Sequence, residues 1–514
     1  MSSLRLRARD SVPVLFTSMG LVVILGMLVL MLWILLSRGL VAFWPHSLER
    51  IVMQDGRVVL GEVWDQVDTP DGERLRVRTG NRDLWGQEFV QLDGAQVSSR
   101  ELAEGAFLVE RLNQGIFIGM PGELHIPDAR ITPADADYRS KLDDALDVAI
   151  ALNSTQEHTL GQLHRLAGRI APEAGEGPRV DRARAQYTVL ETRLDSLIQQ
   201  RGAVSLTLSA IDGTDLVVPL ADVVRLVPSN ELGTIGRSGV YMSRLWEFLT
   251  AEPRESNTAG GVMPAIFGTV LMVLLMSIAV VPVGVMAAVY LNDYARQGFL
   301  VQTIRLAVNN LAGVPSIVYG IFGLGFFIYF VGGGLDQLFF SDSLPTPTFG
   351  TGGILWASLT LALLTMPVVV VATTEGLQSV SQTTRMAALA LGATRWQMIR
   401  QVVLPNAMPG ILTGLILAIS RAAGEVAPLM ITGVVKLAPS LALDLDAPYL
   451  HLDRKFMHLG FHIYDLGFQS PNVEAALPML FSTALLLIIV VLMLNLVAIL
   501  LRNALRKRFK QAAF

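Results

Sequence analysis

The sequence predicts an α-helical membrane protein with six transmembrane helices and an inserted extracytoplasmic domain of mixed α/β structure, in which β strands accompany a helical hairpin. Of its 514 residues, 52% are hydrophobic and 16% are charged, and the mean hydropathy of +0.49 is typical of a membrane protein with a soluble part attached. About 33 of the 44 acidic residues but only about 23 of the 40 basic ones lie between residues 38 and 262. That segment is therefore the predicted soluble domain.

Six apolar runs are each long enough to cross roughly 30 Å of hydrocarbon as a helix. The first run is too long for a cleaved signal peptide, and no A-x-A pattern follows it, so we expect an uncleaved span. Three spans contain a proline, which marks either a plain kink or a joint that moves. The spans are 12–36, 265–291, 304–331, 354–373, 407–435 and 479–501, and the prolines are Pro282, Pro315 and Pro367.

Basic loops predict the orientation of these spans. Arg296 and Arg305 bracket one loop, a second loop carries three arginines, and the C-terminal tail is rich in Lys and Arg, whereas the loop at 332–353 has neither residue. Because basic loops remain in the cytoplasm, we expect both termini there, in a multi-pass, lipid-contacting protein of the bacterial inner membrane. The predicted domains are 1–37 with the first span, 38–261 in the periplasm, and 262–514 with five helices and a cytoplasmic tail.

Short strands are predicted in the soluble segment. Between residues 46 and 126, apolar and polar side chains alternate as they do on strands with one buried face, and Asp-Gly pairs at 55–56 and 71–72 indicate turns. The alternation resumes at 204–208 and 216–227. We therefore expect a small β domain.

A helical hairpin is predicted to interrupt this domain. Apolar residues recur at helical spacing in 135–170 and 180–200, and the Gly- and Pro-rich stretch 171–178 separates them. Residues 243–250 are expected to form a short interfacial helix.

Several classes of function are disfavoured by what the sequence lacks. There is no cysteine, and no G-x-x-x-x-G-K-[ST] motif that could cradle ATP phosphates. No block of basic residues interleaves with aromatic ones, so nucleic acid is a poor partner. His125, His158 and His164 are not at zinc spacing and are expected to be solvated or at the edge of the core. We expect a chain that is not an enzyme and binds no metal or cofactor itself.

Polar and small residues occur in and near the third predicted span. Asn309, Asn310 and Ser316 could either line a path or bond to a neighbouring helix. Three glycines in this span have a spacing similar to a nucleotide-binding fingerprint. Because no strand precedes them, they are expected to lie where helices pack together. They are Gly320, Gly323 and Gly325.

The loop 375–405, between the fourth and fifth spans, has a pattern of its own. Residues 383–391 favour a short helix, Gly392 a helix stop, and 393–404 a second helix that ends at Pro405. Four side chains are expected to be exposed on the cytoplasmic face, Arg385, Arg395, Trp396 and Arg400. The loop either fixes topology alone or docks another subunit. Tyr290, Asp293 and Tyr294, at the cytoplasmic end of the second span, are expected to be interface anchors.

Arg421 and Glu425 are two charges inside an otherwise apolar span. At i,i+4 they are expected to share one helix face. A charge at mid-membrane costs at least about 2.5–3.5 kcal/mol, so both should face the bundle interior or a wet cavity. One possibility is that they form a structural ion pair. The other is that Arg421 binds an oxyanion with its planar fork of donors, and that Glu425 pairs with Arg421 while the path is empty.

The sequence here resembles a known family. Membrane subunits of ABC importers carry E-A-A, three residues, G, nine residues and I-x-L-P. This chain has Met386-Ala387-Ala388, then Gly392, then Val402 to Pro405 at that spacing. The stretches LAGVPSIVYGIFGL, from Leu311, and RAAGEVAPLMITG, from Arg421, are similar to the PstA family of phosphate-importer permeases. The resemblance is strong over about 260–435 and does not cover the outer domain. Met386 stands where the motif has Glu.

The resemblance implies the type I ABC importer permease fold and a coupling helix, from about Arg385 to Arg400, that is seated in an ATPase subunit. The implied partners are a second, PstC-like permease, a PstB-like ATPase dimer that holds ATP-Mg, and a PstS-like periplasmic phosphate-binding protein. Phosphate would pass along Arg421 and Glu425. The implied coupling residues are Arg385, Ala387, Ala388, Gly392, Arg395, Trp396, Arg400, Leu404 and Pro405.

Two alternatives remain open at this point. The chain could be a permease for another oxyanion, such as sulfate or molybdate, because arginine chemistry suits all of them. It could also be a membrane-anchored sensor or scaffold that acts through its outer domain. Six spans and a cytoplasmic tail of about a dozen residues argue against a sensor.

Overall fold

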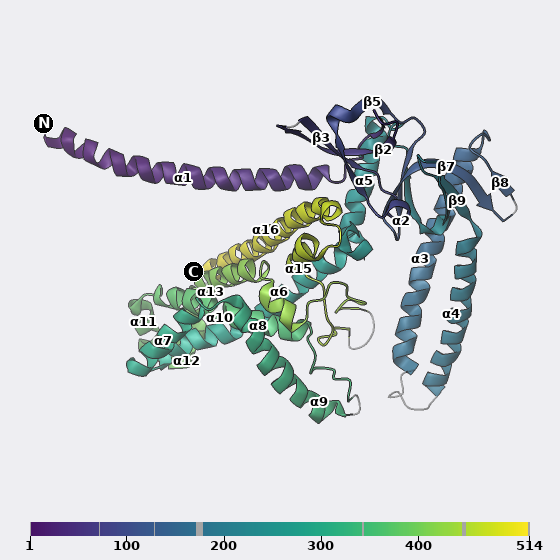
Figure 1. Ribbon diagram of the computed structural model, residues 1–514. Helices are drawn as coiled ribbons and strands as arrows, with labels where there is room; N and C mark the ends of the chain where they lie inside the picture. The colour runs from purple at the N-terminus through teal and green to yellow at the C-terminus, as the bar shows by residue number, and fades with distance from the viewer. Residues whose placement is uncertain are drawn as a thin grey trace. The chain divides into compact units, whose positions relative to one another are not determined.

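The computed structural model describes residues 2–70, 72–127, 129–170, 178–341, 344–444 and 449–511 (Figure 1). The chain divides into two compact units. The membrane unit comprises Met1–Ala42 and Val262–Phe514, and the outer unit comprises Phe43–Gly261.

The membrane unit contains six helices of membrane-spanning length and composition among the described residues, which confirms the predicted fold class. Three of them include a π-helical turn, which shifts the hydrogen-bond register without ending the helix. The spans are formed by α1 (Ser2–Val41); α6 (Met263–Val289) with η5 (Tyr290–Tyr294); α8 (Ser316–Phe322), η6 (Gly323–Gly332) and α9 (Gly333–Phe339); α10 (Ile354–Gln378); α12 (Arg395–Met398), η8 (Ile399–Val403) and α13 (Leu404–Ala422); and α16 (Val473–Gln511).

Helix α10 lies at the centre of this unit, packed between α6 and α13. Glycines allow the helices to approach closely. A Cβ atom on Gly410 of α13 would lie 2.6 Å from the Cα atom of Gly376 on α10, and one on Gly284 of α6 would lie 2.7 Å from Val369. Such contacts replace the hydrophobic effect as the source of helix association inside a bilayer.

The third predicted span was wrong at its start. Residues 299–311 form a separate helix, α7 (Phe299–Leu311), which at 13 residues is only about 20 Å long and cannot cross the bilayer. The chain then breaks, and Pro315 caps α8 instead of lying within a span, because proline has no N–H to donate and restricts the residue before it. Asn309 and Asn310 therefore lie on α7, outside the membrane-length helices.

The described part of the outer unit contains two larger antiparallel sheets with the same strand order, besides a two-stranded sheet of β12 (Pro253–Arg254) and β13 (Ala259–Gly260). The first is ordered β4-β3-β2-β1-β5 and the second β10-β9-β7-β6-β11, with β8 paired to β7. The strands are β1 (Leu48–Met53), β2 (Val58–Thr69), β3 (Gly72–Arg78), β4 (Phe89–Asp93), β5 (Val97–Leu102), β6 (Phe107–Arg111), β7 (Ile116–Ile126), β8 (Ala129–Ile131), β9 (Ser205–Ser209), β10 (Asp215–Pro219) and β11 (Val223–Val227).

If β8 is left out and the strands of each sheet are numbered one to five in chain order, the strand order of both sheets is 4-3-2-1-5. We infer that the outer unit contains an internal repeat. A short 3₁₀ turn precedes the last strand of each copy, η1 (Gly94–Gln96) and η3 (Leu220–Asp222). Each second strand has a glycine against the third strand. A Cβ atom on Gly61 would lie 2.3 Å from the Arg78 carbonyl oxygen, and one on Gly119 would lie 2.4 Å from that of Ser209. The predicted strands are confirmed, but the sequence did not predict the repeat.

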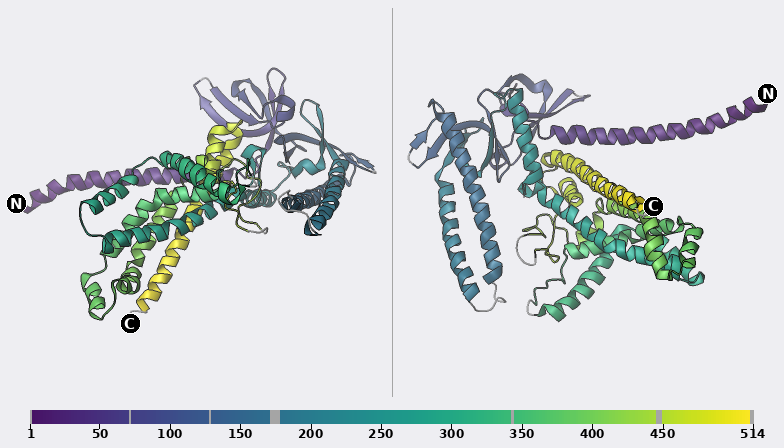
Figure 2. Two further views of the ribbon diagram at one scale, coloured as in Figure 1. Left: turned by 90° about the horizontal axis from the view of Figure 1, so that it is seen from below. Right: turned by 180° about the vertical axis from the view of Figure 1, so that it is seen from behind.

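The predicted helical hairpin is confirmed as α3 (Tyr138–Ile170) and α4 (Pro178–Ala203), which run side by side in both views of Figure 2. The hairpin is inserted between the second and third main strands of the second copy. Residues 171–177 lie outside the described residues, and so does the side chain of His164. The predicted helix at 243–250 is the end of a longer one, α5 (Thr234–Thr250).

A buried charge cluster fastens α5 to the second sheet. Glu110 of β6 pairs with Arg225 of β11 and Arg244 of α5, and Glu247 pairs with Arg225 and Arg254. Burial alone would raise the pKa of Glu110, but the guanidinium groups of Arg244 and Arg225 outweigh it and lower that pKa. The cluster is an internal structural feature, since all its members pair with one another.

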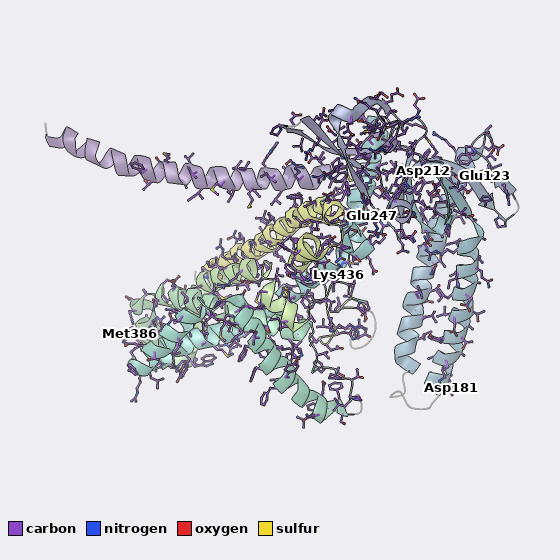
Figure 3. The ribbon with its side chains drawn as sticks, in the orientation of Figure 1. Glu123, Asp181, Asp212, Glu247, Met386 and Lys436 are labelled. Atoms are coloured by element: carbon purple, nitrogen blue, oxygen red, sulfur yellow. The ribbon has the colours of Figure 1, made fainter. Side chains whose placement is uncertain are left out.

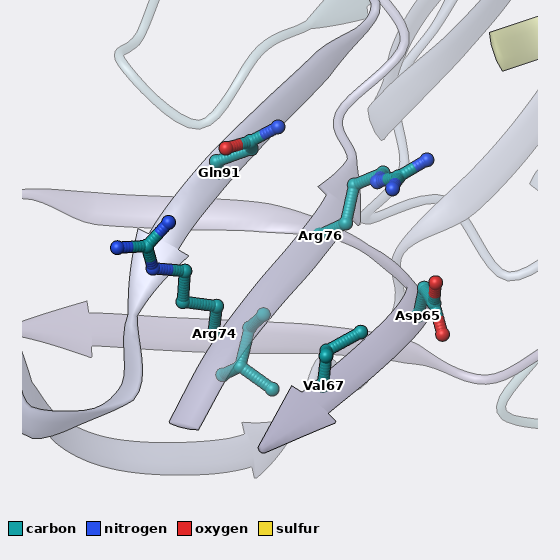
Figure 4. Close-up of a pocket in the computed structure, with 6 residues that line it drawn as sticks. Asp65, Val67, Arg74, Arg76 and Gln91 are labelled. Atoms are coloured by element: carbon teal, nitrogen blue, oxygen red, sulfur yellow. The ribbon is translucent and has the colours of Figure 1, made fainter. Parts of the chain in front are cut away.

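A shallow groove lies on the solvent face of the first sheet (Figure 4). Arg74 and Arg76 point away from the buried Leu75 because side chains alternate along β3. Asp93 is opposite Arg74, and Asp65 is opposite Arg76. Each cation therefore faces a carboxylate on a neighbouring strand.

Candidate functional site

The loop between α10 and α13 forms two short helices, as predicted. Ser381 caps α11 (Gln382–Ala390) by accepting a hydrogen bond from the Thr384 N–H. Thr394 caps α12 in the same way and forms a capping box with Gln397. Between them, Gly392 has a φ of +84°, the left-handed region that glycine adopts without steric cost. Nothing lies within 4 Å of the position of a Cβ atom on Gly392, so its backbone conformation, and not lack of space, requires glycine there.

Two of the four side chains expected to be exposed on this loop contact the end of α6, although Arg395 is still exposed as predicted. Arg385 pairs with Asp293 and donates to the Leu377 carbonyl oxygen at 2.6 Å. Arg395 donates to the Asp293 carbonyl oxygen and lies over the ring of Tyr294, 5.3 Å from its centroid. The prediction that Arg385 is exposed was wrong, because that side chain is largely buried, while its docking role stays a prediction. Asp293 and Tyr294 hold the loop to the end of α6, and their expected role as interface anchors stays a prediction.

The rest of the loop exposes both polar and apolar side chains. Trp396 and Arg400 are exposed, and Ala388 is half-buried against the helices. The exposed apolar side chains on α11 and the turn after it are Met386, Ala387, Leu389, Ala390 and Leu391, and Met386 is labelled in Figure 3. A patch of this kind beside a rigid turn fits a protein partner.

We predicted that the second helix of the loop ends at Pro405, and this prediction was wrong. Leu404 and Pro405 open α13, and one helical segment continues from Arg395 to Ala422. A proline removes one backbone donor, and the π-helical turn η8 just before it shifts the hydrogen-bond register. Motion of α12 is therefore directly connected to the span that carries Arg421.

Arg421 and Glu425 do not share a helix face, because the helix is broken between them. Helix α13 ends at Ala422, and α14 (Ala427–Thr432) begins only after a turn in which the Glu425 N–H donates to the Ala422 carbonyl oxygen. Gly424 and Pro428 flank this turn and disfavour a continuous helix. Both charged residues therefore lie at an interruption of the fifth span, the kind of place where transporters form substrate sites.

The Arg421 guanidinium is held only loosely. Its Nε atom lies 3.6 Å from Oε1 of Glu425, which is too long for a hydrogen bond, and among the described residues the guanidinium donates no other. The side chain of Arg421 is 34% exposed and that of Glu425 22%. Tyr319 of α8 is near enough to Arg421 to interact electrostatically, while its hydroxyl donates to the Leu311 carbonyl oxygen. An arginine with unused donors is thus accessible inside the membrane unit.

Helix α8 packs against the break. A Cβ atom on Gly320 would lie 2.8 Å from the Cα atom of Pro428, and one on Gly323 would lie 2.9 Å from Thr432. The prediction that these glycines pack helices is confirmed, but it was wrong for Gly325, which has no neighbour within 4 Å.

The weaker predicted path residues are not brought to this break by any described contact. Asn309 and Asn310 are exposed on α7, and Ser316 is the half-buried first residue of α8. No local pattern predicts the pairing of Arg385 with Asp293, because the two residues are 92 positions apart.

Comparison with known proteins identifies the family. Residues 280–511 match the model of the binding-protein-dependent transport system inner membrane component. The phosphate transport system permease protein PstA 1 of Mycobacterium tuberculosis is 34% identical over 229 residues, which are 45% of this chain and 67% of that protein. PstA of Yersinia pestis is 35% identical over 187 residues, 36% of this chain and 57% of that protein.

A third relative, the probable ABC transporter permease protein YqgI of Bacillus subtilis, is 30% identical over 187 residues, 36% of this chain and 58% of that protein. The chain thus covers between 57% and 67% of the lengths of these three relatives. The matched segment contains α10, the loop, α13 and the break at Arg421. The chain belongs to the family of binding-protein-dependent transport system inner membrane components.

Proposed function

We propose that this chain is a permease subunit of an ATP-driven importer that moves inorganic phosphate into the cytoplasm. The observation that carries the proposal is the Arg421 guanidinium at the break in the fifth span, accessible and without a hydrogen bond among the described residues. Likeness to two phosphate transport system permeases supports phosphate as the substrate.

The loose pair suits passage of an anion better than tight capture. A guanidinium offers two parallel N–H donors to a phosphate and remains charged at any physiological pH. Glu425, 3.6 Å away, competes for the same donors and so limits affinity. A site that must release its ion has to bind weakly enough for the ion to leave.

The loop with α11 and α12 is the proposed contact with an ATPase subunit. Its exposed apolar side chains would dock there, and its anchor to Asp293 would transmit movement of the ATPases to α6 and α13. The proposed partners are a PstC-like second permease, a PstB-like ATPase dimer with ATP-Mg, and a PstS-like binding protein. In this arrangement both termini are cytoplasmic and residues 38–261 periplasmic.

Uptake by a strain that lacks this chain tests the substrate. Complementation with the full-length chain should restore accumulation of radiolabelled phosphate and leave sulfate and molybdate accumulation unchanged. Restored sulfate or molybdate uptake, with phosphate unaffected, would replace phosphate by that oxyanion.

A further inference from the structure

A second cation and carboxylate pair lies beyond α14. The Val435 N–H donates to the Phe456 carbonyl oxygen at 3.0 Å, and the chain then presents Lys436. Its Nζ atom lies 3.1 Å from Oδ1 of Asp465, the first residue of the π-helical turn η9 (Asp465–Gln469). The Lys436 side chain is 34% exposed, whereas that of Asp465 is 1% exposed. A buried carboxylate thus holds a lysine that solvent can reach.

A buried histidine next to this pair has no hydrogen-bond partner. His462 lies on α15 (Leu459–Tyr464), is only 2% exposed, and neither of its ring nitrogens has a partner among the described residues. Burial lowers the pKa of His462 to about 4, and the charge of Lys436 lowers this pKa further while that of Asp465 raises it. The ring is therefore neutral at pH 7 and has one N–H donor. Because an unpaired buried polar group costs free energy, a ligand that bonds to His462 would recover that cost.

The arrangement repeats that of Arg421 and Glu425. In both pairs a cation that is one third exposed is held by a less exposed carboxylate, and the two pairs flank α14 in the chain. Lys436 lies at the end of the membrane unit opposite Met386 of the loop (Figure 3). Given the proposed orientation, a substrate from outside would meet Lys436 before Arg421.

We propose that Lys436, Asp465 and His462 form an outer oxyanion site that selects protonated phosphate before it reaches Arg421, which rests on the proposed function. Lys436 supplies charge, and the neutral ring of His462 supplies one N–H donor. The Asp465 carboxylate accepts only, so it favours an oxyanion that still carries an O–H. Phosphate keeps at least one P–OH near neutral pH, whereas sulfate has none. Asp465 therefore repels sulfate, and no hydrogen bond between them offsets that repulsion.

Uptake kinetics of the complete importer test the cation. Lys436→Gln should raise the KM for phosphate roughly tenfold, the effect of losing one charge-assisted hydrogen bond, with maximal velocity nearly unchanged. Lys436→Arg should recover most of the affinity. The matched control is Lys455→Gln, since Lys455 is an exposed lysine of the same outer segment without a described ion pair. An unchanged KM in Lys436→Gln would overturn the site.

Competition by sulfate tests the carboxylate. Excess sulfate should inhibit phosphate uptake in Asp465→Asn much more than in the wild type, because the amide no longer repels a fully ionised oxyanion. Equal inhibition of both would refute selection by Asp465. Co-purification with the ATPase subunit verifies assembly, and if Asp465→Asn fails to assemble, the Lys436 variants decide alone. Failure of the wild-type chain to restore phosphate uptake would refute the proposed function instead.

Discussion

Arg385 and Arg421 belong to the same membrane unit and are held in opposite ways. Arg385 is largely buried, pairs with Asp293 and also donates to a backbone carbonyl oxygen. Arg421 is more exposed, and Glu425, its one charged partner among the described residues, lies beyond hydrogen-bond distance. A buried and fully paired cation fixes a structure, while a cation with unused donors remains available to a ligand. This difference supports our proposal that Arg421 meets the substrate, while Arg385 holds the loop in place.

The largest effect on assembly is expected from Asp293→Ala. Removing one member of a buried pair leaves Arg385 uncompensated, which typically costs about 3–5 kcal/mol. We expect loss of ATPase co-purification and a lower yield of folded chain. The double variant Asp293→Ala/Arg385→Leu should recover part of the loss, because it leaves no buried charge behind. Assembly of Asp293→Ala at the wild-type level would contradict the claim that the pair of Arg385 and Asp293 holds the loop in place.

A smaller effect is expected from Gly392→Val. A β-branched residue at φ +84° is strained by about 1–2 kcal/mol, so the angle between α11 and α12 should change. ATPase activity should become less dependent on binding protein and phosphate, as measured in reconstituted vesicles. The control is Gly325→Ala, a helical glycine with no neighbour within 4 Å, which should behave normally.

The smallest effect is expected from Met386→Glu, which installs the residue found in the related motif. Met386 is exposed, and a new surface charge pair contributes about 0–1 kcal/mol. Affinity for the ATPase subunit should therefore change by less than about fivefold relative to Met386→Gln, measured by titration in detergent. A larger change would mean that the interface depends on a charge at this position.

Much of the membrane unit follows from the sequence, because apolar runs of sufficient length have few alternatives to spanning helices. The breaks were missed for a physical reason. Hydropathy continues across 312–315 and 423–426, and it does not report which backbone hydrogen bonds are absent there. Pro315 and Gly424 were the available signals.

The site was only partly predictable. The cost of a charge in the membrane singles out Arg421 and Glu425 from their identity alone, but only the structure gives their separation. The anchor of Arg385 to Asp293 joins residues 92 positions apart, and no local pattern encodes it. The repeat in the outer unit was hidden for a similar reason, since two copies share strand order and a glycine, Gly61 or Gly119, but little other sequence.

Phosphate uptake by the assembled importer carrying Arg421→Ala tests the central claim most directly. We predict that uptake falls at least about 100-fold, the loss expected for a bidentate charge-assisted contact, while the ATPase subunit co-purifies in normal amounts. Arg421→Lys should also be severely impaired, because an ammonium group lacks the planar fork. Wild-type uptake in Arg421→Ala would contradict the account, and so would a loss of uptake that is explained entirely by failed assembly.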